Sequence, residues 1–491
     1  MTTETAHPAT HTPARSLSTS LPSGHPFSAF RTSDKSGVHD LSGVSAESFP
    51  SGPGGPSGPS GPSGTKRTTG TNRTGATNGT SRTPQSTRSH RARASRNGKN
   101  AGVCTDHATA AERADALATG DFPAFADALF GHLPRTDQRR WAHSYLLALL
   151  TTEGKKSVRR LAAAVSDSPT ASQSLHQFLN ASPWDWGPVR RELVRRAEAT
   201  TPPRAWILAP AVLPKRGGHS VGVHRRFCSS AGRTVSCQLA MGMFLPVGEA
   251  PATPATAAAA AASGDCGGST AVSVDWRLFL PPQWVEDPEL LRRNRIPAPE
   301  AHGPRPMWAH ALDLVETQAA RTSCPPAPVV ADLSEYSDSV RLIEALARQG
   351  RDFVIAVPPA TALATPATPG MPGDPGARPR LLQSAPTPVR LPNSHHTYRA
   401  FTEPGPGRPA RVWLTNMAHR RMGQLLGLAR LHQLPTATLR ALEADFGLYD
   451  FEGRSYPGWH HHMTLTSAAH AYRVLADEPD EQTLATVRFV S

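Results

Sequence analysis

The chain of 491 residues carries 52 lysine and arginine residues against 39 aspartate and glutamate residues, a formal net charge of +13. No apolar run approaches the roughly 20 residues that span a bilayer, so we expect no membrane partner. The charge is uneven, because residues 1–100 hold 12 basic and 4 acidic residues, a net of 12 − 4 = +8. The remaining 491 − 100 = 391 residues are nearly balanced in charge and long enough to bury a sizeable core.

Residues 1–107 are predicted to be a disordered tail. Its first part is rich in serine, threonine, proline and glycine, which bury too little apolar area to offset chain entropy. Residues 65–100 hold nine basic residues and no acid, a pattern typical of segments that bind phosphate through counterion release. A solubilising tail or an over-extended translation start explains the same composition. The absence of an apolar signal region and of a CxxC pair favours a cytoplasmic location.

Residues 108–202 are predicted to form a helical domain, because apolar residues such as Phe122, Phe125 and Leu129 recur at helical spacing. Two short helices are expected at 157–164 and 170–179, separated by a polar break with good helix-start residues. This arrangement is compatible with a helix-turn-helix that binds DNA, and equally with ordinary packing of a helical bundle. In the first case the second helix presents outward the polar residues Ser172, Gln173, His176 and Gln177.

Residues 203–491 alternate between strand and helix patterns. Strands are expected at 205–208, 235–247, 273–281, 328–332, 352–357 and 412–416. Helices are expected at 307–320, at 338–349 and from about residue 422 onward. Two irregular insertions, rich in proline and small residues, are expected at about 249–271 and 358–410. The order predicts an α/β fold with a mixed sheet flanked by helices.

Basic residues cluster on a hairpin expected after the first of these strands. Phosphate contact and a solvated surface are both consistent with this cluster. Its members are Lys215, Arg216, His219, Arg225 and Arg226.

Four segments carry a resemblance to a known family. They are HSVGVHRRFC (219–228), VDWRLFLPPQWVEDPELLRRNRIP (274–297), VVAD (329–332) and FEGRSYPGWHHHMTL (451–465). In this order they resemble bacterial insertion-sequence DDE transposases of the insertion sequence 701-like group, which is related to the insertion sequence 4 superfamily. The resemblance runs from about residue 114 to residue 475.

The resemblance implies an RNase H-like catalytic core over 203–491, preceded by a helical DNA-binding domain over 108–202. It implies DNA transposition, with DNA at insertion-sequence ends as the partner, self-association on those ends and no small-molecule substrate. Cleavage and joining of DNA strands in such enzymes requires Mg²⁺ or Mn²⁺, held by three carboxylates.

This chain departs from the family pattern at two of the three acids. The family's second acid is retained as Asp332 and is the expected catalytic and metal-binding residue. The family's first acid falls on Ala209-Pro210, and its third falls on Thr436. Pro435 is expected to disturb the helix that carries this third position. A single carboxylate cannot hold two metal ions in a fixed geometry, so the active site is predicted to be degenerate.

Other acids and histidines were weighed as substitutes. Glu443 and Glu452 are candidate relocated carboxylates, although a salt bridge is the alternative for Glu452. Asp275 lies in a strand pattern that favours an ion pair over metal ligation. The consecutive residues His460–His462 point about 100° apart on a helix and cannot chelate one metal, so they are expected on a helix face near phosphate or solvent.

Three hypotheses follow from the sequence. The first is an active transposase that uses relocated carboxylates. The second is a catalytically impaired protein that still binds DNA, including the case of a repurposed regulator. The third is a decayed element without a selected role.

Overall fold

The computed structural model describes residues 117, 119–228, 232–248, 269–364, 385–392, 394–403 and 411–476. The described residues belong to one compact unit, Asn100–Ser491. The tail predicted over 1–107 lies outside the described residues, as does most of the insertion predicted at 249–271. The boundary predicted at residues 202 and 203 stays a prediction.

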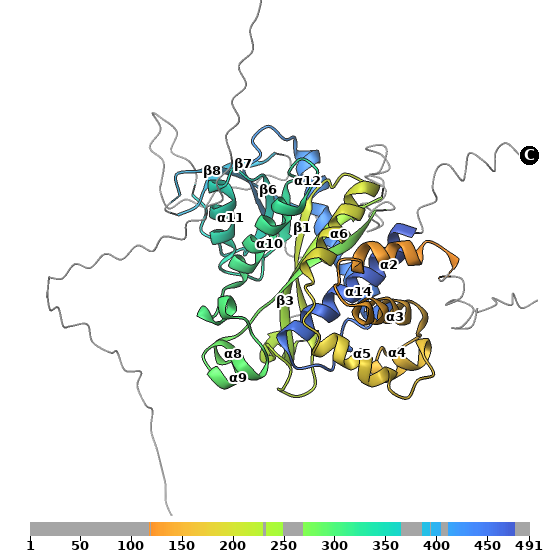
Figure 1. Cartoon of the computed structure of the whole chain (residues 1–491). Helices are drawn as coiled ribbons and strands as arrows, with labels where there is room; N and C mark the ends of the chain where they lie inside the picture. The colour runs from red at the N-terminus through yellow and green to blue at the C-terminus, as the bar shows by residue number, and fades with distance from the viewer. Residues whose placement is uncertain are drawn as a thin grey trace, which may run out of the picture. The chain divides into compact units, whose positions relative to one another are not determined.

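A nine-stranded mixed sheet forms the centre of the fold (Figure 1). Its order is β2-β3-β1-β5-β6-β9-β8-β7, and β4 pairs with β3 beside this path. The neighbours β1, β5 and β6 are parallel, and the remaining pairs are antiparallel. The strands are β1 (Trp206–Pro214), β2 (His224–Cys228), β3 (Arg233–Val247), β4 (Thr270–Leu278), β5 (Val329–Asp332), β6 (Phe353–Val357), β7 (Thr387–Arg390), β8 (Thr397–Thr402) and β9 (Val412–Thr415).

The central strands are buried because their sequences are almost wholly apolar. All five residues of β6 and the first three of β5 are buried, as expected for parallel strands covered on both faces. The strand predicted at 205–208 is longer than expected, since Ala209–Pro214 continue in antiparallel pairing with β3. The observed architecture is therefore a mixed sheet with helices, as the sequence predicts.

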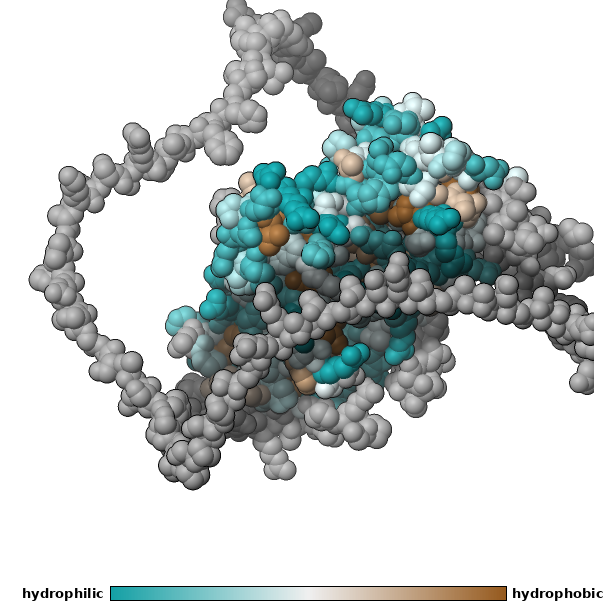
Figure 2. Space-filling model, turned by 90° about the horizontal axis from the view of Figure 1, so that it is seen from below, coloured by the Kyte–Doolittle hydropathy of each residue, from teal (hydrophilic) through white to brown (hydrophobic). Residues whose placement is uncertain are grey.

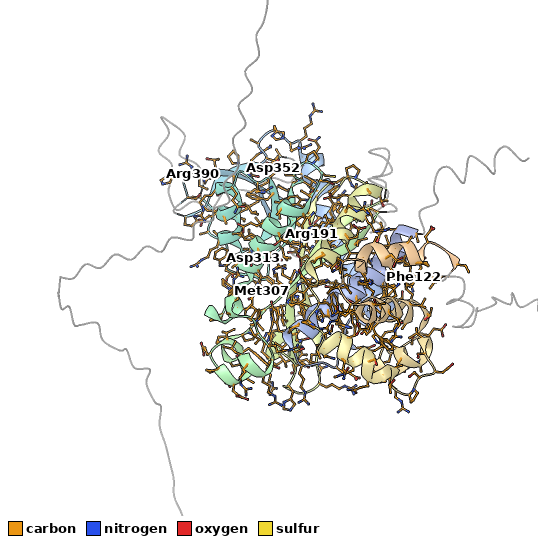
Figure 3. The ribbon with its side chains drawn as sticks, in the orientation of Figure 1. Phe122, Arg191, Met307, Asp313, Asp352 and Arg390 are labelled. Atoms are coloured by element: carbon orange, nitrogen blue, oxygen red, sulfur yellow. The ribbon has the colours of Figure 1, made fainter. Side chains whose placement is uncertain are left out.

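Among the described residues, five helices precede the sheet in the chain. They are α2 (Phe122–Phe130), α3 (Thr136–Thr151), α4 (Val158–Val165), α5 (Ala171–Asn180) and α6 (Gly187–Thr200). The expected apolar stripe of α2 is buried, and the ring of Phe122 packs edge-on against Tyr472 of the C-terminal helix at 5.6 Å (Figure 3). The two short helices expected at 157–164 and 170–179 are confirmed within one residue at each end.

The remaining helices follow β4. They are α8 (Pro282–Val285), α9 (Pro288–Arg293), η2 (Ala298–His302), α10 (Met307–Arg321), α11 (Ser339–Arg348), α12 (Met422–Arg430), η3 (Leu431–Gln433), α13 (Leu434–Phe446) and α14 (Tyr456–Ala476). Helices α10 and α11 pack on each other and against β3 and β6 respectively, whereas α12 and η3 contact β5. The helices α3, α5 and α6 surround α14 (Figure 1).

The expectation that the three consecutive histidines lie near solvent or phosphate is wrong. His460, His461 and His462 are at most 2% exposed, because α14 is enclosed on all sides. Each ring stacks on a different partner: His460 on Trp186 at 4.6 Å, His461 on Trp184 at 3.9 Å and His462 on Phe451 at 5.3 Å. They point in separate directions, as the helical geometry requires, and serve as core residues.

The expectation of an irregular segment over 358–410 is wrong for two stretches. Residues 387–390 form β7 and residues 397–402 form β8, which extend the sheet through β9. Proline is tolerated in β7 because this strand is the last in the sheet order.

None of the helices that the structure describes is long and apolar enough to cross a membrane. The face seen in Figure 2 is predominantly hydrophilic. Phe227 on β2 is a large hydrophobic residue that is nevertheless 63% exposed.

Candidate functional site

A cleft of about 790 Å³ opens where the parallel pairing of β1 with β5 ends, at the carboxyl end of β5 and the middle of β1. The two strands pair through Leu208 and Ala331, and the next residue of each strand is Ala209 and Asp332. The register therefore sets these two positions side by side at the cleft. The lining residues are Leu208, Ala209, Pro210, Ser269, Asp332, Ser334, Glu335, Tyr336, Arg411, His432, Gln433, Leu434, Pro435, Thr436, Ala437, Leu439 and Arg440.

The cleft brings together all the positions that the family resemblance assigns to metal-binding acids. Ala209 and Pro210 come from β1, Asp332 from the end of β5 and Thr436 from the first turn of α13. These residues are far apart in the chain, and only the tertiary structure makes them neighbours. Of the four, only Asp332 carries a carboxylate.

Both carboxylate oxygens of Asp332 have protein partners. Oδ1 accepts hydrogen bonds from the backbone N–H of Ser334 at 3.1 Å and from its hydroxyl at 2.6 Å. Oδ2 lies 2.7 Å from Nε of Arg411. The Asp332 side chain is 23% exposed and that of Arg411 is 34% exposed, so water reaches this ion pair.

The remaining polar groups of the cleft do not restore an excess of negative charge. Glu335 adds a second carboxylate, and Arg440 adds a second guanidinium. Burial lowers the pKa of His432, whose Nδ1 lies 2.6 Å from the carbonyl oxygen of Ala429. With that histidine neutral, two negative and two positive side chains line the cleft.

Pro435 lies where the helical path to Thr436 is interrupted, as expected from sequence: the 3-10 segment η3 separates α12 from α13 directly before it. The helix α13 begins at Leu434, so the proline lies in its first turn. The backbone N–H groups of a first turn have no partner within the helix, and proline is therefore tolerated there.

The two candidate substitute acids do not line this cleft. Glu443 is exposed, seven residues beyond Thr436 on the same helix. Glu452 forms an exposed salt bridge with Lys155 at 3.2 Å, and its role as a relocated acid stays a prediction.

The residues at the cleft do not fit two Mg²⁺ ions. Mg²⁺ requires hard oxygen ligands, and the single family acid present already bonds a guanidinium. Across the described part of the chain, no group of three histidine, cysteine, aspartate or glutamate residues is arranged to hold a metal ion.

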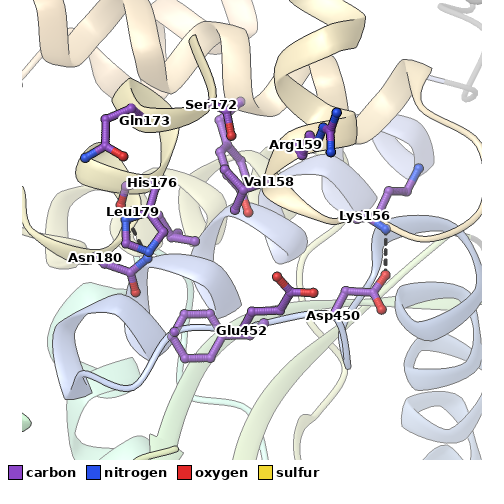
Figure 4. Close-up of a pocket in the computed structure, with 13 residues that line it drawn as sticks. Lys156, Val158, Arg159, Ser172, Gln173, His176, Leu179, Asn180, Asp450 and Glu452 are labelled. Atoms are coloured by element: carbon purple, nitrogen blue, oxygen red, sulfur yellow. Dashed lines mark hydrogen bonds between the residues drawn. The ribbon is translucent and has the colours of Figure 1, made fainter. Parts of the chain in front are cut away.

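A second cleft, of about 400 Å³, lies between the helices α4 and α5 and the segment 450–453 (Figure 4). Figure 4 shows Asp450 and Glu452 on one side, with Arg159, Ser172 and Gln173 opposite.

Lys156 fixes the loop at the edge of this cleft. The Asp450 carboxylate accepts a hydrogen bond from the backbone N–H of Lys156 at 2.7 Å. Burial lowers the pKa of the Lys156 ammonium to about 8, and its Nζ donates to backbone carbonyls. The lysine therefore anchors the loop before α4.

Gly453 is required where the segment 451–455 crosses α5. A Cβ atom at this position would lie 2.1 Å from Oδ1 of Asn180 and 2.4 Å from the ring of Phe451. The glycine of the FEGRS segment thus permits a close approach to α5. An adjoining cleft of about 570 Å³ shares His176 and Asn180 and is lined by the guanidinium groups of Arg293, Arg295 and Arg454.

The exposed face of α5 lies between two polar clefts. Gln173, His176 and Gln177 are exposed, as predicted, while Ser172 is half-buried. Gln173 and His176 line the cleft at Arg159, whereas Gln177 lines a cleft of about 490 Å³ on the other flank. That third cleft also contains Arg135, Arg140 and Trp141, with Arg140 lying 4.9 Å above the Trp141 ring.

The basic residues near β2 fall into two groups. Arg216 and Arg225 are exposed. Arg226 instead lies 5.3 Å above the ring of Tyr336, which lines the Asp332 cleft. Lys215 is tied by hydrogen bonds from Nζ to the carbonyls of Tyr449 and Phe451, at 3.2 and 3.1 Å. Burial lowers the pKa of Lys215 to about 8.

Asp275 forms the ion pairs predicted for it, but with more partners than the sequence indicates. Three guanidinium groups, from Arg190, Arg277 and Arg321, lie within 3.0 Å of its carboxylate. Burial raises the pKa of Asp275, but the three arginines outweigh this effect and hold the pKa at about 2. Arg190 is 1% exposed. Its role as a partner of Asp275 was not predicted, because its helix carries several other arginines and the sequence does not show which of them is buried.

In open α/β sheets, ligands bind in crevices at the carboxyl ends of parallel strands, and this cleft lies at the carboxyl end of β5. A family model for the DDE superfamily endonucleases matches residues 128–403, which is 276 of the 491 residues. The chain therefore belongs to the DDE superfamily endonuclease family. The matched residues include Ala209, Pro210 and Asp332, while Thr436 lies beyond them.

Seven chains of solved structures also match this protein. One is the cryo-EM structure of the piggyBac transposase synaptic complex with hairpin DNA, with 9% sequence identity and a TM-score of 0.37. That match covers 76% of this chain and 76% of the other. No curated protein matches the chain.

Proposed function

We propose that this DDE superfamily member is a transposase-type protein of the insertion sequence 701-like group that binds DNA and is impaired in strand cleavage. The observation that carries the proposal is the Asp332 cleft, where Ala209, Pro210 and Thr436 stand in place of acids. The proposal includes an RNase H-like core over 203–491, a DNA-binding region over 108–202 and a cytoplasmic location.

The impairment follows from the chemistry of the reaction. In-line displacement at a phosphodiester depends on metal ions that stabilise the attacking and leaving oxygens. The loss of two carboxylates removes the ligands that would position those ions, and Arg411 already neutralises the remaining one. Removal of such electrostatic stabilisation typically lowers the rate by several orders of magnitude.

DNA binding is supported by the charges around α5. The exposed polar residues Gln173, His176 and Gln177 form a ridge, with Arg135 and Arg140 on one flank and Arg159 on the other. An α-helix fits the major groove of B-DNA, whose two phosphate backbones then lie on either side of the helix. Glutamine is a suitable reader of adenine, and arginine is a suitable phosphate contact.

The β2 region offers further phosphate contacts. Arg216 and Arg225 are exposed and are the residues we assign to the DNA backbone. Arg226 lies between this strand and the Asp332 cleft, where it orders Tyr336. Lys215 differs from them, since its ammonium group holds the segment 449–451.

A paired assay on the full chain tests the proposal. Fluorescence anisotropy follows binding to duplex DNA, including candidate element ends, over a salt series, and a gel follows nicking of the same duplex with Mg²⁺ or Mn²⁺. We expect salt-sensitive binding without nicking.

Two variants separate base contacts from phosphate contacts. Gln177→Ala is expected to reduce the discrimination between DNA sequences. Arg140→Gln is expected to weaken binding to all sequences and to lower the slope of log K against log salt concentration by about 1.

The matched control is Arg341→Gln, which removes the same charge from an exposed position on α11. Nicking that disappears in Asp332→Asn would show that other acids complete the site and would contradict the impairment. The absence of any DNA binding at low salt would contradict the proposal as a whole.

A further inference from the structure

We propose that the Asp332 cleft binds a DNA phosphodiester directly, with Arg411 supplying the positive charge in place of a divalent cation. This inference rests on the proposed function and adds to it a second DNA contact, separate from α5. The ligand class is the sugar-phosphate backbone of a nucleic acid strand.

The geometry of Arg411 supports this assignment. Its Nε lies 2.7 Å from Oδ2 of Asp332, and this ion pair holds the guanidinium group at the cleft. In the described part of the chain no protein partner is found for its two Nη atoms, and the side chain is 34% exposed in a cleft. A guanidinium held through Nε still presents paired N–H donors from its other edge, which suit two phosphate oxygens.

The remaining walls of the cleft offer this ligand a second cation and a hydroxyl group, and they include one opposing carboxylate, Glu335. Arg440 lies exposed on α13 and lines the cleft as a second cation, and Thr436 on the same helix adds a hydroxyl group. The volume of about 790 Å³ is in the range that accommodates a nucleotide-sized ligand. Ser334 occupies Oδ1 of Asp332 with two hydrogen bonds, so that carboxylate is satisfied without a metal ion.

The position of Arg411 also opposes a divalent cation. A cation bound to Oδ2 of Asp332 would replace the guanidinium or lie against it, and like charges at that distance repel strongly. Aspartate 332 therefore acts as a positioning residue for the arginine. The same acid that would hold a metal ion in the family chemistry here orients a fixed organic cation.

Binding of Mn²⁺, followed by the loss of the free-ion EPR signal, tests the exclusion of the metal. We expect the full chain to show no Asp332-dependent Mn²⁺ site below about 1 mM. The double variant Ala209→Asp/Thr436→Glu places carboxylates at two positions that line the cleft. We expect the triple variant that also carries Arg411→Gln to bind Mn²⁺ at least tenfold more tightly than the double variant. Sub-millimolar binding by the unmodified chain that is lost in Asp332→Asn would overturn the inference.

Binding of a duplex oligonucleotide in EDTA tests the phosphate contact. We expect unchanged affinity on adding Mg²⁺ at constant ionic strength, and about tenfold weaker binding in Arg411→Gln and in Arg440→Gln. Arg440 is exposed, so its variant reports on the contact even where the Arg411 variant folds poorly. Arg341→Gln serves as the control of equal charge.

The outcomes separate this inference from the function on which it rests. Loss of binding in the α5 variants, with the Arg411 and Arg440 variants equal to the Arg341 control, would overturn the cleft contact and leave DNA binding standing. A chain that binds no duplex at any salt concentration would contradict both. Dependence of wild-type binding on Mg²⁺ would contradict the substitution of the cation by Arg411.

Discussion

Two aspartates of this protein each bond an arginine, and the two sites differ chiefly in access to water. Asp275 and Arg190 are 3% and 1% exposed, whereas Asp332 and Arg411 are 23% and 34% exposed. In the first site every group must be satisfied by protein, because an unpaired buried charge is costly. In the second site water can satisfy the groups, so the guanidinium remains accessible to a ligand. Similar chemistry thus serves the core in one place and a cleft in the other.

The largest effect is expected from breaking the buried pair. Arg190→Met leaves Asp275 with two partly exposed arginines and removes the hydrogen bonds to Thr464 and to the backbone of Trp276. We expect a loss of about 3–5 kcal/mol in the free energy of unfolding, measured by urea denaturation. Arg191→Met, at the exposed neighbouring position labelled in Figure 3, should change it by less than about 0.5 kcal/mol. A loss below 1 kcal/mol for Arg190→Met would refute the structural role.

The second effect concerns pH and the buried histidines of α14. Burial lowers the pKa of His461 to about 4, of His462 to about 3 and of His470 to about 4. In the unfolded chain these imidazoles take up a proton near pH 6.5, whereas in the folded protein they stay neutral to lower pH. Their contribution to the free energy of unfolding is therefore full above pH 6.5 and is lost as the pH falls toward the folded pKa. The loss is up to about 1.4 kcal/mol per pH unit for each histidine.

Urea denaturation between pH 7 and pH 5 measures this slope. His470→Gln should reduce the number of protons taken up on unfolding by one, since His470 is 4% exposed and its Nδ1 lacks a partner. His176→Gln, at an exposed position on α5, should leave the slope unchanged. Equal slopes for wild type and both variants would show that His470 is not held neutral by the fold.

A smaller effect is expected from the exposed pair in the cleft. Asp332→Asn should change the free energy of unfolding by less than about 1 kcal/mol, because both side chains are partly hydrated. The same variant removes a negative charge beside Arg411 but keeps an amide oxygen in its place, so DNA binding should weaken less than in Arg411→Gln. Thermal unfolding and anisotropy on the same sample check both statements. A loss comparable to that of Arg190→Met would erase the contrast between the two sites.

The smallest effect is expected from Glu452→Gln. Its salt bridge with Lys155 joins two side chains that are each 60% exposed, and such pairs contribute between zero and about 1 kcal/mol. We expect no measurable change in unfolding and no change in nicking with Mg²⁺. If nicking is present in wild type and vanishes here, Glu452 is a relocated catalytic acid after all.

The pattern of the sequence predicted most of the elements because their physical causes are local. The stripe from Phe122 to Phe130 is buried as its helical spacing indicates, and the apolar runs at β5 and β6 form central parallel strands. The strand β7 was missed because proline and short length obscure a strand pattern at a sheet edge. The strand β8 was missed because the proline-rich composition of residues 358–410 as a whole indicated irregular structure.

The site was predictable only in part. Asp332, Ala209 and Thr436 could be singled out from the resemblance, and the structure places them at one cleft. Arg411 could not, because no local signal marks which of the 52 basic residues meets a given acid. The burial of His460–His462 was also beyond a local pattern, since three consecutive helix positions are all buried only where neighbours enclose the helix.

Most of the helices and strands, the uneven charge and the lack of an acid at Ala209-Pro210 and Thr436 could be recognised before the fold was known. The elements and the charge depend on side-chain type and on spacing within a few residues, whereas the positions of the missing acids are what the family resemblance implies. Only the tertiary structure decided that Arg190 meets Asp275 in the core and that Arg411 meets Asp332 in an open cleft. The physical reason is that hydration and long-range neighbours set the strength and the availability of a charge, and neither is encoded locally.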